Sequence, residues 1–137
     1  MHVIHNGFNT KPVSKSRASS RISRDTKHPM IIGTVGRYDP HKDHLNLINA
    51  LHLFNKKNED FIAYFIGEGL DESNEHLVNV IKDFGLERKI KLIGLSNDVQ
   101  QYYSMMDIFI LSSEAESFPN VIGEAMISGV PCISTDV

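Results

Sequence analysis

The sequence predicts an α/β protein built on a doubly wound parallel sheet. Two observations lead to this fold class. Short apolar runs recur along the chain, and they alternate with segments whose apolar residues repeat at helical spacing. Within the runs, apolar and polar residues do not alternate, which is typical of strands covered by helices on both faces. Five strands and four helices are predicted in this way, so the sheet is expected to be Rossmann-like.

The composition is that of one ordinary domain. The chain has 137 residues, of which 41% are apolar and 23% charged, enough for a single core of modest size. A net charge of −3 gives no support to a nucleic-acid partner. No signal peptide and no apolar run near the ~18 residues of a membrane span is visible, so the expected location is the cytoplasm. The lone Cys132 allows no disulfide within the chain.

The first apolar run, Met30 to Val35, predicts a strand, and a polar loop follows it. The loop contains Arg37 and Lys42 and leads into a helix with an apolar face. Two cations in one loop at a strand end suggest an anion site, and two unrelated surface cations are the alternative. His41 and His44 are three residues apart with no third ligand in sight, which is weak evidence for a metal.

The second run, Phe61 to Ile66, predicts a strand that ends in Gly67-Glu68-Gly69. This is half of a dinucleotide-binding fingerprint, but Glu72 replaces the third glycine. The pattern also follows the second strand rather than the first, so a dinucleotide site is disfavoured. The next helix is expected to stop at Gly85, with positive φ there and Leu86 folded back onto the helix.

A third strand is predicted over Ile90 to Leu95 and a fifth over Val130 to Thr135. Ser96-Asn97-Asp98 supplies a cap for the helix after the third strand. Tyr102 and Tyr103 lie on the inner side of that helix. We expect them to belong to the core, and a platform for stacking a base is the alternative.

The fourth strand, Asp107 to Ser113, leads into the most informative stretch, a polar loop followed by a helix start. Pro119 suits the first helical turn, where its missing N–H leaves no bond unmade. Free amides near Asn120 to Ile122, at the positive end of the helix dipole, favour an anion in the loop. Glu116 and Glu124 are predicted to border the same pocket. Two solvated acids around a helix start are the alternative.

This stretch resembles the signature of retaining nucleotide-sugar glycosyltransferases of family 4, which have the two-domain GT-B fold. The signature places two glutamates, with seven residues between them, in a Ser-x-x-Glu-x-Phe-Pro…Glu-Ala-Met context. Here the glutamates are Glu116 and Glu124, Phe118-Pro119 lies between them, and Gly129-Val130-Pro131 follows. The resemblance spans nearly the whole chain and is strongest over residues 30–137.

The resemblance implies that the chain is the donor-binding, Rossmann-like half of a GT-B enzyme. The residues implied for the donor diphosphate are Arg37, Lys42, Asn120 and Val121, and those for the donor sugar are Glu116, Ser117 and Phe118. Glu116 is also the implied catalytic residue. Glu124 is implied for the ribose, and Leu95 and Ser96 are implied to lie near the nucleobase. Neither a metal nor a cofactor is expected beyond the nucleotide-sugar co-substrate, because the cations and the helix dipole neutralise the diphosphate.

The resemblance also implies a domain boundary. Residues 1–10 resemble the hinge that leaves the N-terminal acceptor domain of these enzymes. The polar, basic segment that follows predicts a mobile linker, and contact with an anionic membrane surface is the alternative. We therefore expect residues 1–29 to be hinge and linker, and 30–137 to be an incomplete nucleotide-sugar-binding domain. The chain is expected to be truncated at both ends and inactive alone.

The function implied by the resemblance is that of a hexosyltransferase. It would transfer a sugar, with retention, from a nucleotide-diphosphate sugar to a saccharide or lipid-linked acceptor in surface polysaccharide or glycolipid synthesis. The expected location is the cytoplasm, with peripheral contact at the inner face of the membrane as a further option. A nucleotide-sugar-binding module without transfer activity, or a GT-B relative such as a nucleotide-sugar epimerase, are the alternatives, because fold alone does not decide function.

Overall fold

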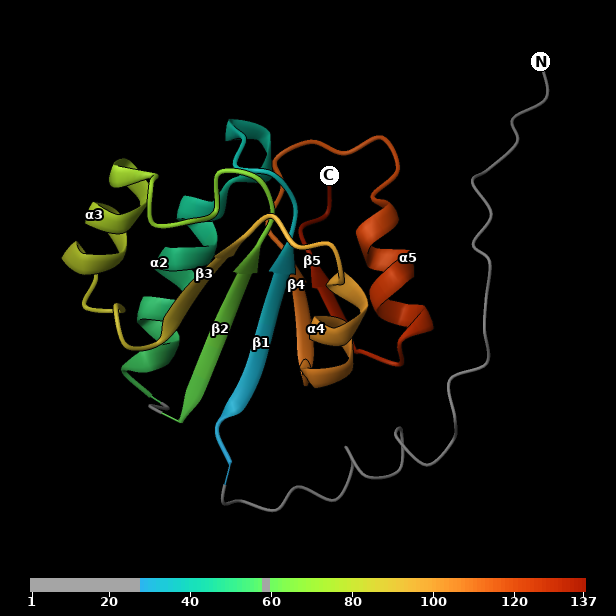
Figure 1. Ribbon diagram of the computed structural model, residues 1–137, viewed down its shortest axis with the longest axis horizontal. Helices are drawn as coiled ribbons and strands as arrows, with labels where there is room; N and C mark the ends of the chain where they lie inside the picture. Colours follow the sequence, from blue (N-terminus) through green and yellow to red (C-terminus); the bar gives the residue numbers. More distant parts are fainter. Residues whose placement is uncertain (1–27, 58–59) are drawn as a thin grey trace.

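A five-stranded parallel sheet forms the centre of the molecule (Figure 1). The computed structural model describes residues 28–57 and 60–137, and the strand order is β3-β2-β1-β4-β5. The strands are β1 (Met30–Val35), β2 (Phe61–Ile66), β3 (Ile90–Gly94), β4 (Ile108–Leu111) and β5 (Cys132–Ser134). The chain adds strands outward from β1 to β3 and then returns to the other side of β1. The predicted fold class, a doubly wound parallel sheet, is confirmed.

Helices connect the strands, because a parallel pair requires a crossover between its members. They are the 3-10 helix η1 (Pro40–Lys42) and the α-helices α2 (His44–Asn55), α3 (Glu75–Asp83), α4 (Val99–Met105) and α5 (Asn120–Ile127). The pair α2 and α3 covers one face of the sheet, and the pair α4 and α5 covers the other (Figure 1). Each face therefore has a core of its own.

Both cores are tightly closed. On the side of α2 and α3, Ile48 and Leu77 have no exposed surface. On the side of α4 and α5, Met106 and Phe109 are equally buried, and Tyr103 is 1% exposed. The prediction that Tyr103 belongs to the core is confirmed. Burial on both faces explains why the strand sequences carry no alternation.

Local sequence sets where three of the helices begin. The side chains of Asp43, Asn74 and Asp98 each accept a hydrogen bond from the amide three residues further on, at 3.1, 3.1 and 3.2 Å. Such caps satisfy amides that have no partner inside the helix. The cap predicted over residues 96–98 is confirmed at Asp98, which precedes α4.

The predicted end of the third strand is wrong by one residue. The strand ends at Gly94 and not at Leu95, whose side chain is 78% exposed. Gly94 has a φ of 70°, and its amide donates to the Leu70 carbonyl in the loop after β2 at 2.8 Å. This turn directs the chain out of the sheet before Leu95.

The fourth and fifth strands are also shorter than predicted. The fourth starts at Ile108 and ends at Leu111, before the two serines that follow. The fifth starts at Cys132, because the amide of Val130 still donates to the carbonyl of Ala125 at 3.0 Å and so belongs to the end of α5. The strands on this side of the sheet are therefore shorter than the apolar runs suggest.

Gly67 allows the loops after β1 and β2 to touch. Its φ is 145°, and a Cβ at this position would lie 2.0 Å from the carbonyl oxygen of Gly36. Tyr38 N also donates to the Glu68 carbonyl at 2.7 Å. Only glycine fits here. The contact supports the loop that carries the predicted cations.

The predicted hinge and basic linker lie outside the described residues, apart from 28 and 29. Within the described part, no helix combines the length and apolarity needed to cross a bilayer.

The predicted stop of α3 is confirmed, because Gly85 has a φ of 68° and Leu86 is fully buried.

Candidate donor-binding site

The candidate site lies where the chain changes direction within the sheet. The strands β1 and β4 are neighbours, and Ile32 pairs with Ile108. The loops that follow them, residues 36–43 and 112–119, therefore emerge side by side at the carboxyl edge. The amide of Glu114 donates to the carbonyl of His41 at 2.8 Å and joins the two loops directly. Such a switch point is where open α/β sheets bind ligands.

The loop after β1 is held in a defined shape by two aspartates. Asp39 caps η1, because its Oδ1 accepts from the amide of His41 at 2.9 Å. Asp43 has left-handed backbone angles, φ 44° and ψ 53°, and caps α2. Non-glycine residues in this region are uncommon and often lie at functional sites. Between the two aspartates, Lys42 is held at the last position of η1.

A buried serine fastens this loop to the end of β4. Ser112 Oγ lies 2.9 Å from the carbonyl oxygens of both Lys42 and Asp43, and its single proton is shared between them. The side chain is only 6% exposed, so the bond is shielded from water. The backbone that carries Lys42 is thereby held beside the loop that carries Glu116.

Lys42 and Glu116 form an ion pair across the two loops. Lys42 Nζ lies 2.5 Å from Glu116 Oε1, and the two side chains are 24% and 14% exposed. Ser113, which is fully buried, donates its hydroxyl to the same oxygen at 2.6 Å. Burial alone would raise the pKa of Glu116, but the bonds from Lys42 and Ser113 and the charge of Lys42 lower it below its ordinary value. Glu116 is therefore an ionised acceptor at neutral pH.

The pair lines a hollow of about 450 Å³ between the loops. Arg37, Lys42, Glu116, Ser117 and Phe118 contribute to its wall, as do three further residues, Asp39, His41 and Ala115. The structure thus brings together both predicted diphosphate-binding cations and all three predicted sugar-binding residues. A smaller hollow of about 290 Å³ lies on the other side of Glu116 and Ser117, against Pro119 and the residues after β5.

Arg37 differs from Lys42 in its accessibility. Its side chain is 71% exposed, and Nε lies 3.5 Å from Asp39 Oδ2. An exposed ion pair at this distance holds the side chain only weakly. The guanidinium is therefore available to a ligand.

His44 lies directly beneath this loop, at the start of α2. It is 3% exposed, and its Nδ1 is buried without a hydrogen bond from any described residue. The rings of Tyr38 and Phe65 lie 5.8 and 5.9 Å away. Burial, together with the charge of Lys42, lowers the pKa of His44 from 6.5 to about 4. Because His44 is neutral, it does not repel the ammonium of Lys42 in the loop above it.

The two glutamates of the signature do not share a wall. Glu124 lines neither hollow, and its Oε2 accepts from the hydroxyl of Tyr103 at 3.0 Å. Burial and the neighbouring Glu124 raise the pKa of Tyr103 well above its ordinary range, so the phenol stays protonated as a donor. The prediction that Glu116 and Glu124 border one pocket is not supported by this arrangement.

The start of α5 also differs from the prediction. Pro119 is the N-cap residue and does not lie in the first helical turn. The amide of Ile122 is not free, because it donates to the carbonyl of Pro119 at 3.1 Å. Asn120 and Val121 are the first two residues of the helix, and the direction of the dipole is as expected.

The predicted nucleobase residues lie further along the same edge. Leu95 and Ser96 follow β3, two strands away from β1. Leu95 is the most exposed of the large apolar residues in the described part, and Ser96 Oγ accepts from the amide of Asp98 at 3.2 Å. Both residues lie at the carboxyl edge, and their role near the nucleobase stays a prediction.

A family model now bears on this site. The model of the glycosyl transferases group 1 matches residues 15–137, which is most of the chain. The chain belongs to this family. The switch-point hollow is thus the candidate site of a group 1 glycosyltransferase domain.

Similar group 1 proteins are transferases. The chain is 31% identical over 134 residues to the N-acetylgalactosamine-N,N'-diacetylbacillosaminyl-diphospho-undecaprenol 4-alpha-N-acetylgalactosaminyltransferase of Campylobacter jejuni, covering 98% of the chain and 34% of that protein. It is 27% identical over 141 residues to the UDP-Gal:alpha-D-GlcNAc-diphosphoundecaprenol alpha-1,3-galactosyltransferase of Escherichia coli, covering 98% and 36%. The solved structure of Anabaena HepE with UDP-glucose matches at 30% identity and a TM-score of 0.77, covering 97% and 38%. The chain therefore spans about a third of the length of these relatives.

Two residues of this group 1 site were not predicted. Ser112 and Ser113 do not appear among the implied site residues, although the Ser112 hydroxyl joins the two loops and the Ser113 hydroxyl holds Glu116 within its own loop. Two signals were available: Ser113 is the serine of the Ser-x-x-Glu signature, and the two serines stand directly after an apolar run. A buried strand seldom ends in two serines unless their hydroxyls find partners.

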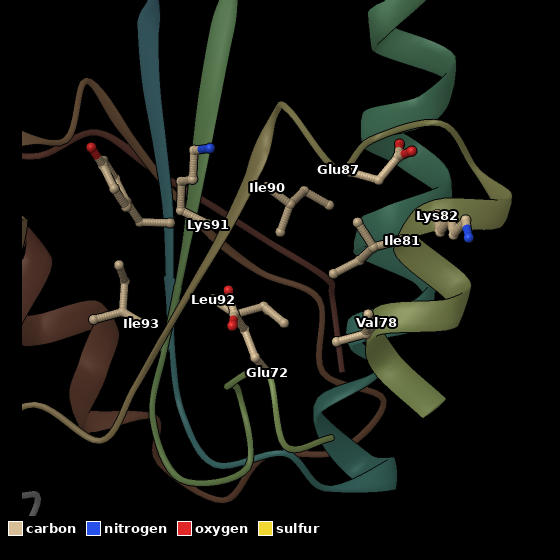
Figure 2. A pocket seen from close by; sticks show the side chains of 10 residues that line it. Glu72, Val78, Ile81, Lys82, Glu87, Ile90, Lys91, Leu92 and Ile93 are labelled. Carbon is tan, nitrogen blue, oxygen red and sulfur yellow. The ribbon is translucent and has the colours of Figure 1, made fainter. Parts of the chain in front are cut away.

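A second region of the domain is hollowed but lies apart from this site. A depression of about 740 Å³ borders β3 and α3 (Figure 2). Its lining is apolar at Ile81, Ile90 and Leu92 and charged at Glu87 and Lys91. None of its lining residues belongs to the predicted site.

Among the described residues, no group of three His, Cys, Asp or Glu side chains converges as metal ligands do.

Proposed function

We propose that the chain is the donor-binding part of a retaining glycosyltransferase of family 4, with a nucleotide-diphosphate sugar as donor. The observation that carries the proposal is the hollow in which Arg37 and Lys42 face Glu116 and Phe118. A donor of this class combines a diphosphate, which needs cations, with a sugar, which offers hydroxyl donors. One solved relative, HepE, is bound to UDP-glucose, a ligand of this kind.

In the proposed function, Arg37 and Lys42 hold the diphosphate. The bond between the anomeric carbon and the phosphate oxygen breaks, and the acceptor oxygen bonds to the same face of the sugar. The acceptor's proton passes to the leaving phosphate. Negative charge grows on that phosphate in the transition state, and fixed cations stabilise it. The amides of Asn120 and Val121, at the positive end of α5, would add to this field.

Glu116 is proposed to contact the donor sugar. As an ionised carboxylate it accepts hydrogen bonds from sugar hydroxyls and steadies the positive charge that develops on the ring. Ser117 and Phe118, which line the same hollow, would complete the sugar subsite. Lys42, which pairs with Glu116, would be drawn toward the phosphate when the diphosphate binds.

Glu124 is proposed to accept from the ribose hydroxyls, and Leu95 and Ser96 to border the base. The hydroxyl of Tyr103 donates to Glu124 Oε2 and so restrains its orientation. No metal or cofactor is required, because side-chain cations and the helix dipole neutralise the diphosphate.

The acceptor side is proposed from the relatives. Both transferases named above carry diphospho-undecaprenol in the name of their substrate, a lipid carrier. We propose a saccharide or lipid-linked acceptor and a role in surface polysaccharide or glycolipid synthesis, in the cytoplasm or at the inner face of the membrane. Because the chain spans about a third of these relatives, we expect it to bind donor without transferring the sugar.

A binding experiment tests this proposal. A thermal-shift panel of UDP, GDP, ADP and their sugar nucleotides should identify one that raises the melting temperature. Arg37→Ala should then weaken that diphosphate by about 1.5–3 kcal/mol in calorimetry, the scale of a hydrogen bond to a charged group, and barely affect the nucleoside. Arg88→Ala, which removes an exposed arginine at the opposite edge of the sheet, is the control. Equal losses for diphosphate and nucleoside would refute the assignment.

A further inference from the structure

Ser113 is tied at both of its polar ends. Its hydroxyl donates to Glu116 Oε1 at 2.6 Å, and its carbonyl accepts from the hydroxyl of Thr135 after β5. Ser113 is fully buried, and only Ser112 separates it from the end of β4. A buried hydroxyl with one proton and one carboxylate acceptor has a single good orientation. Ser113 is therefore a fixed donor, unlike the flexible chain of Lys42.

The two oxygens of Glu116 have different surroundings. Oε1 receives both the Ser113 hydroxyl and the Lys42 ammonium, the latter at 2.5 Å. Oε2 receives no hydrogen bond from any residue in the described ranges. A carboxylate oxygen accepts about two hydrogen bonds, so Oε1 is saturated and Oε2 keeps its full capacity. Glu116 also lines both hollows at this edge.

We propose that Ser113 is a positioning residue that, with Lys42, holds Glu116 by Oε1 and so presents Oε2 to the donor sugar. The sugar part of this inference rests on the proposed function. A carboxylate held by one rigid and one mobile donor cannot exchange its two oxygens without breaking both bonds. When a phosphate attracts Lys42, Ser113 alone keeps the carboxylate in place. Binding of the diphosphate therefore leaves Glu116 oriented for the sugar.

The first test needs no ligand. NMR of isotope-labelled glutamate carboxyls in the 137-residue chain follows the titration of Glu116 directly. Ser113→Ala should raise the pKa of Glu116, because one of its two donors is lost. Ser113→Thr keeps the hydroxyl and should restore the wild-type titration. Ser128→Ala, which removes a buried hydroxyl bonded to the Glu124 carbonyl, is the matched control. An unchanged pKa in Ser113→Ala would overturn the proposal.

The second test uses UDP and UDP-glucose as probes in calorimetry. Ser113→Ala should weaken UDP-glucose about tenfold, the effect of a misplaced hydrogen bond to a charged group, and leave UDP within about twofold. Equal weakening of both ligands, or none for UDP-glucose, would overturn the presentation of Oε2 to the sugar. If the wild-type chain binds neither probe, the choice of donor in the proposed function is in error, and the titration of Glu116 still decides whether Ser113 holds it.

Discussion

His44→Phe should make the fold markedly less sensitive to acid. The wild-type histidine is 3% exposed, packs between the rings of Tyr38 and Phe65, and has a buried Nδ1 without a partner. Phenylalanine keeps a ring in this site but can take up no proton. The substitution also removes a desolvated polar atom, so stability at pH 7 should be retained or raised by about 1 kcal/mol.

The size of the effect follows from the two pKa values. The pKa of His44 is 6.5 in the reference state and about 4 in the folded chain, so the unfolded chain binds the proton more readily. The neutral histidine's contribution is complete above pH 6.5 and is lost as the pH falls through about 4. At about 1.4 kcal/mol per pKa unit, the loss of folding stability in acid amounts to about 3.5 kcal/mol. The variant should escape that loss.

Urea denaturation followed by circular dichroism, at several pH values between about 4 and 7, measures the difference. The free energy of unfolding of the wild type should fall more steeply with acid than that of His44→Phe. His76→Gln, which removes an exposed histidine from α3, controls for the loss of a histidine as such. Parallel curves for wild type and His44→Phe would refute the reasoning, because the buried ring would then carry no linked proton.

Three further predictions test other contacts, and one of them has a matched control variant. Glu116→Gln should release Lys42 and so strengthen the binding of UDP by about 1 kcal/mol in calorimetry, which is the scale of a partly exposed ion pair. Weaker binding of UDP by this variant would contradict the prediction. Gly67→Ala should lower the free energy of unfolding in urea by more than about 3 kcal/mol, because its Cβ would lie 2.0 Å from a carbonyl oxygen. Gly129→Ala, with φ 72° but open space, should cost only about 1 kcal/mol, and similar losses for both would exclude the clash. Phe109→Ala should cost about 3–5 kcal/mol in the same assay, and a loss below about 1 kcal/mol would contradict its full burial.

The elements were predictable because both faces of the sheet are covered. Strands buried on two sides are apolar throughout, and each of the five apolar runs does contain a strand. The strand ends were less predictable, because they depend on partners distant in sequence. The amide of Gly94 donates to the carbonyl of Leu70, so β3 ends there. The amide of Val130 donates to the carbonyl of Ala125, so Val130 belongs to the end of α5 and not to β5. Apolar content alone carries no record of these bonds.

The candidate site was predictable in its residue types but not in its contacts. The resemblance to family 4 indicated Arg37, Lys42 and Glu116, and they line one hollow. The direct pairing of Lys42 with Glu116 joins residues 74 positions apart and depends on β1 and β4 being neighbours. The role of Ser113 depends on which carboxylate oxygen it meets. Glu124, expected in the same pocket, instead accepts a hydrogen bond from the buried phenol of Tyr103, which belongs to α4 on the same face of the sheet.

The order of strands has a consequence for synthesis on the ribosome. The strands β1, β2 and β3, with α2 and α3, occupy residues 30–94 and form most of one core. These residues leave the ribosome before β4 and β5, although a domain generally folds as a unit. Lys42 therefore lacks its ion-pair partner until β4 pairs with β1 and places Glu116 beside it. The candidate donor-binding edge is completed last, so translation products that stop before β4 would lack the Lys42–Glu116 pair.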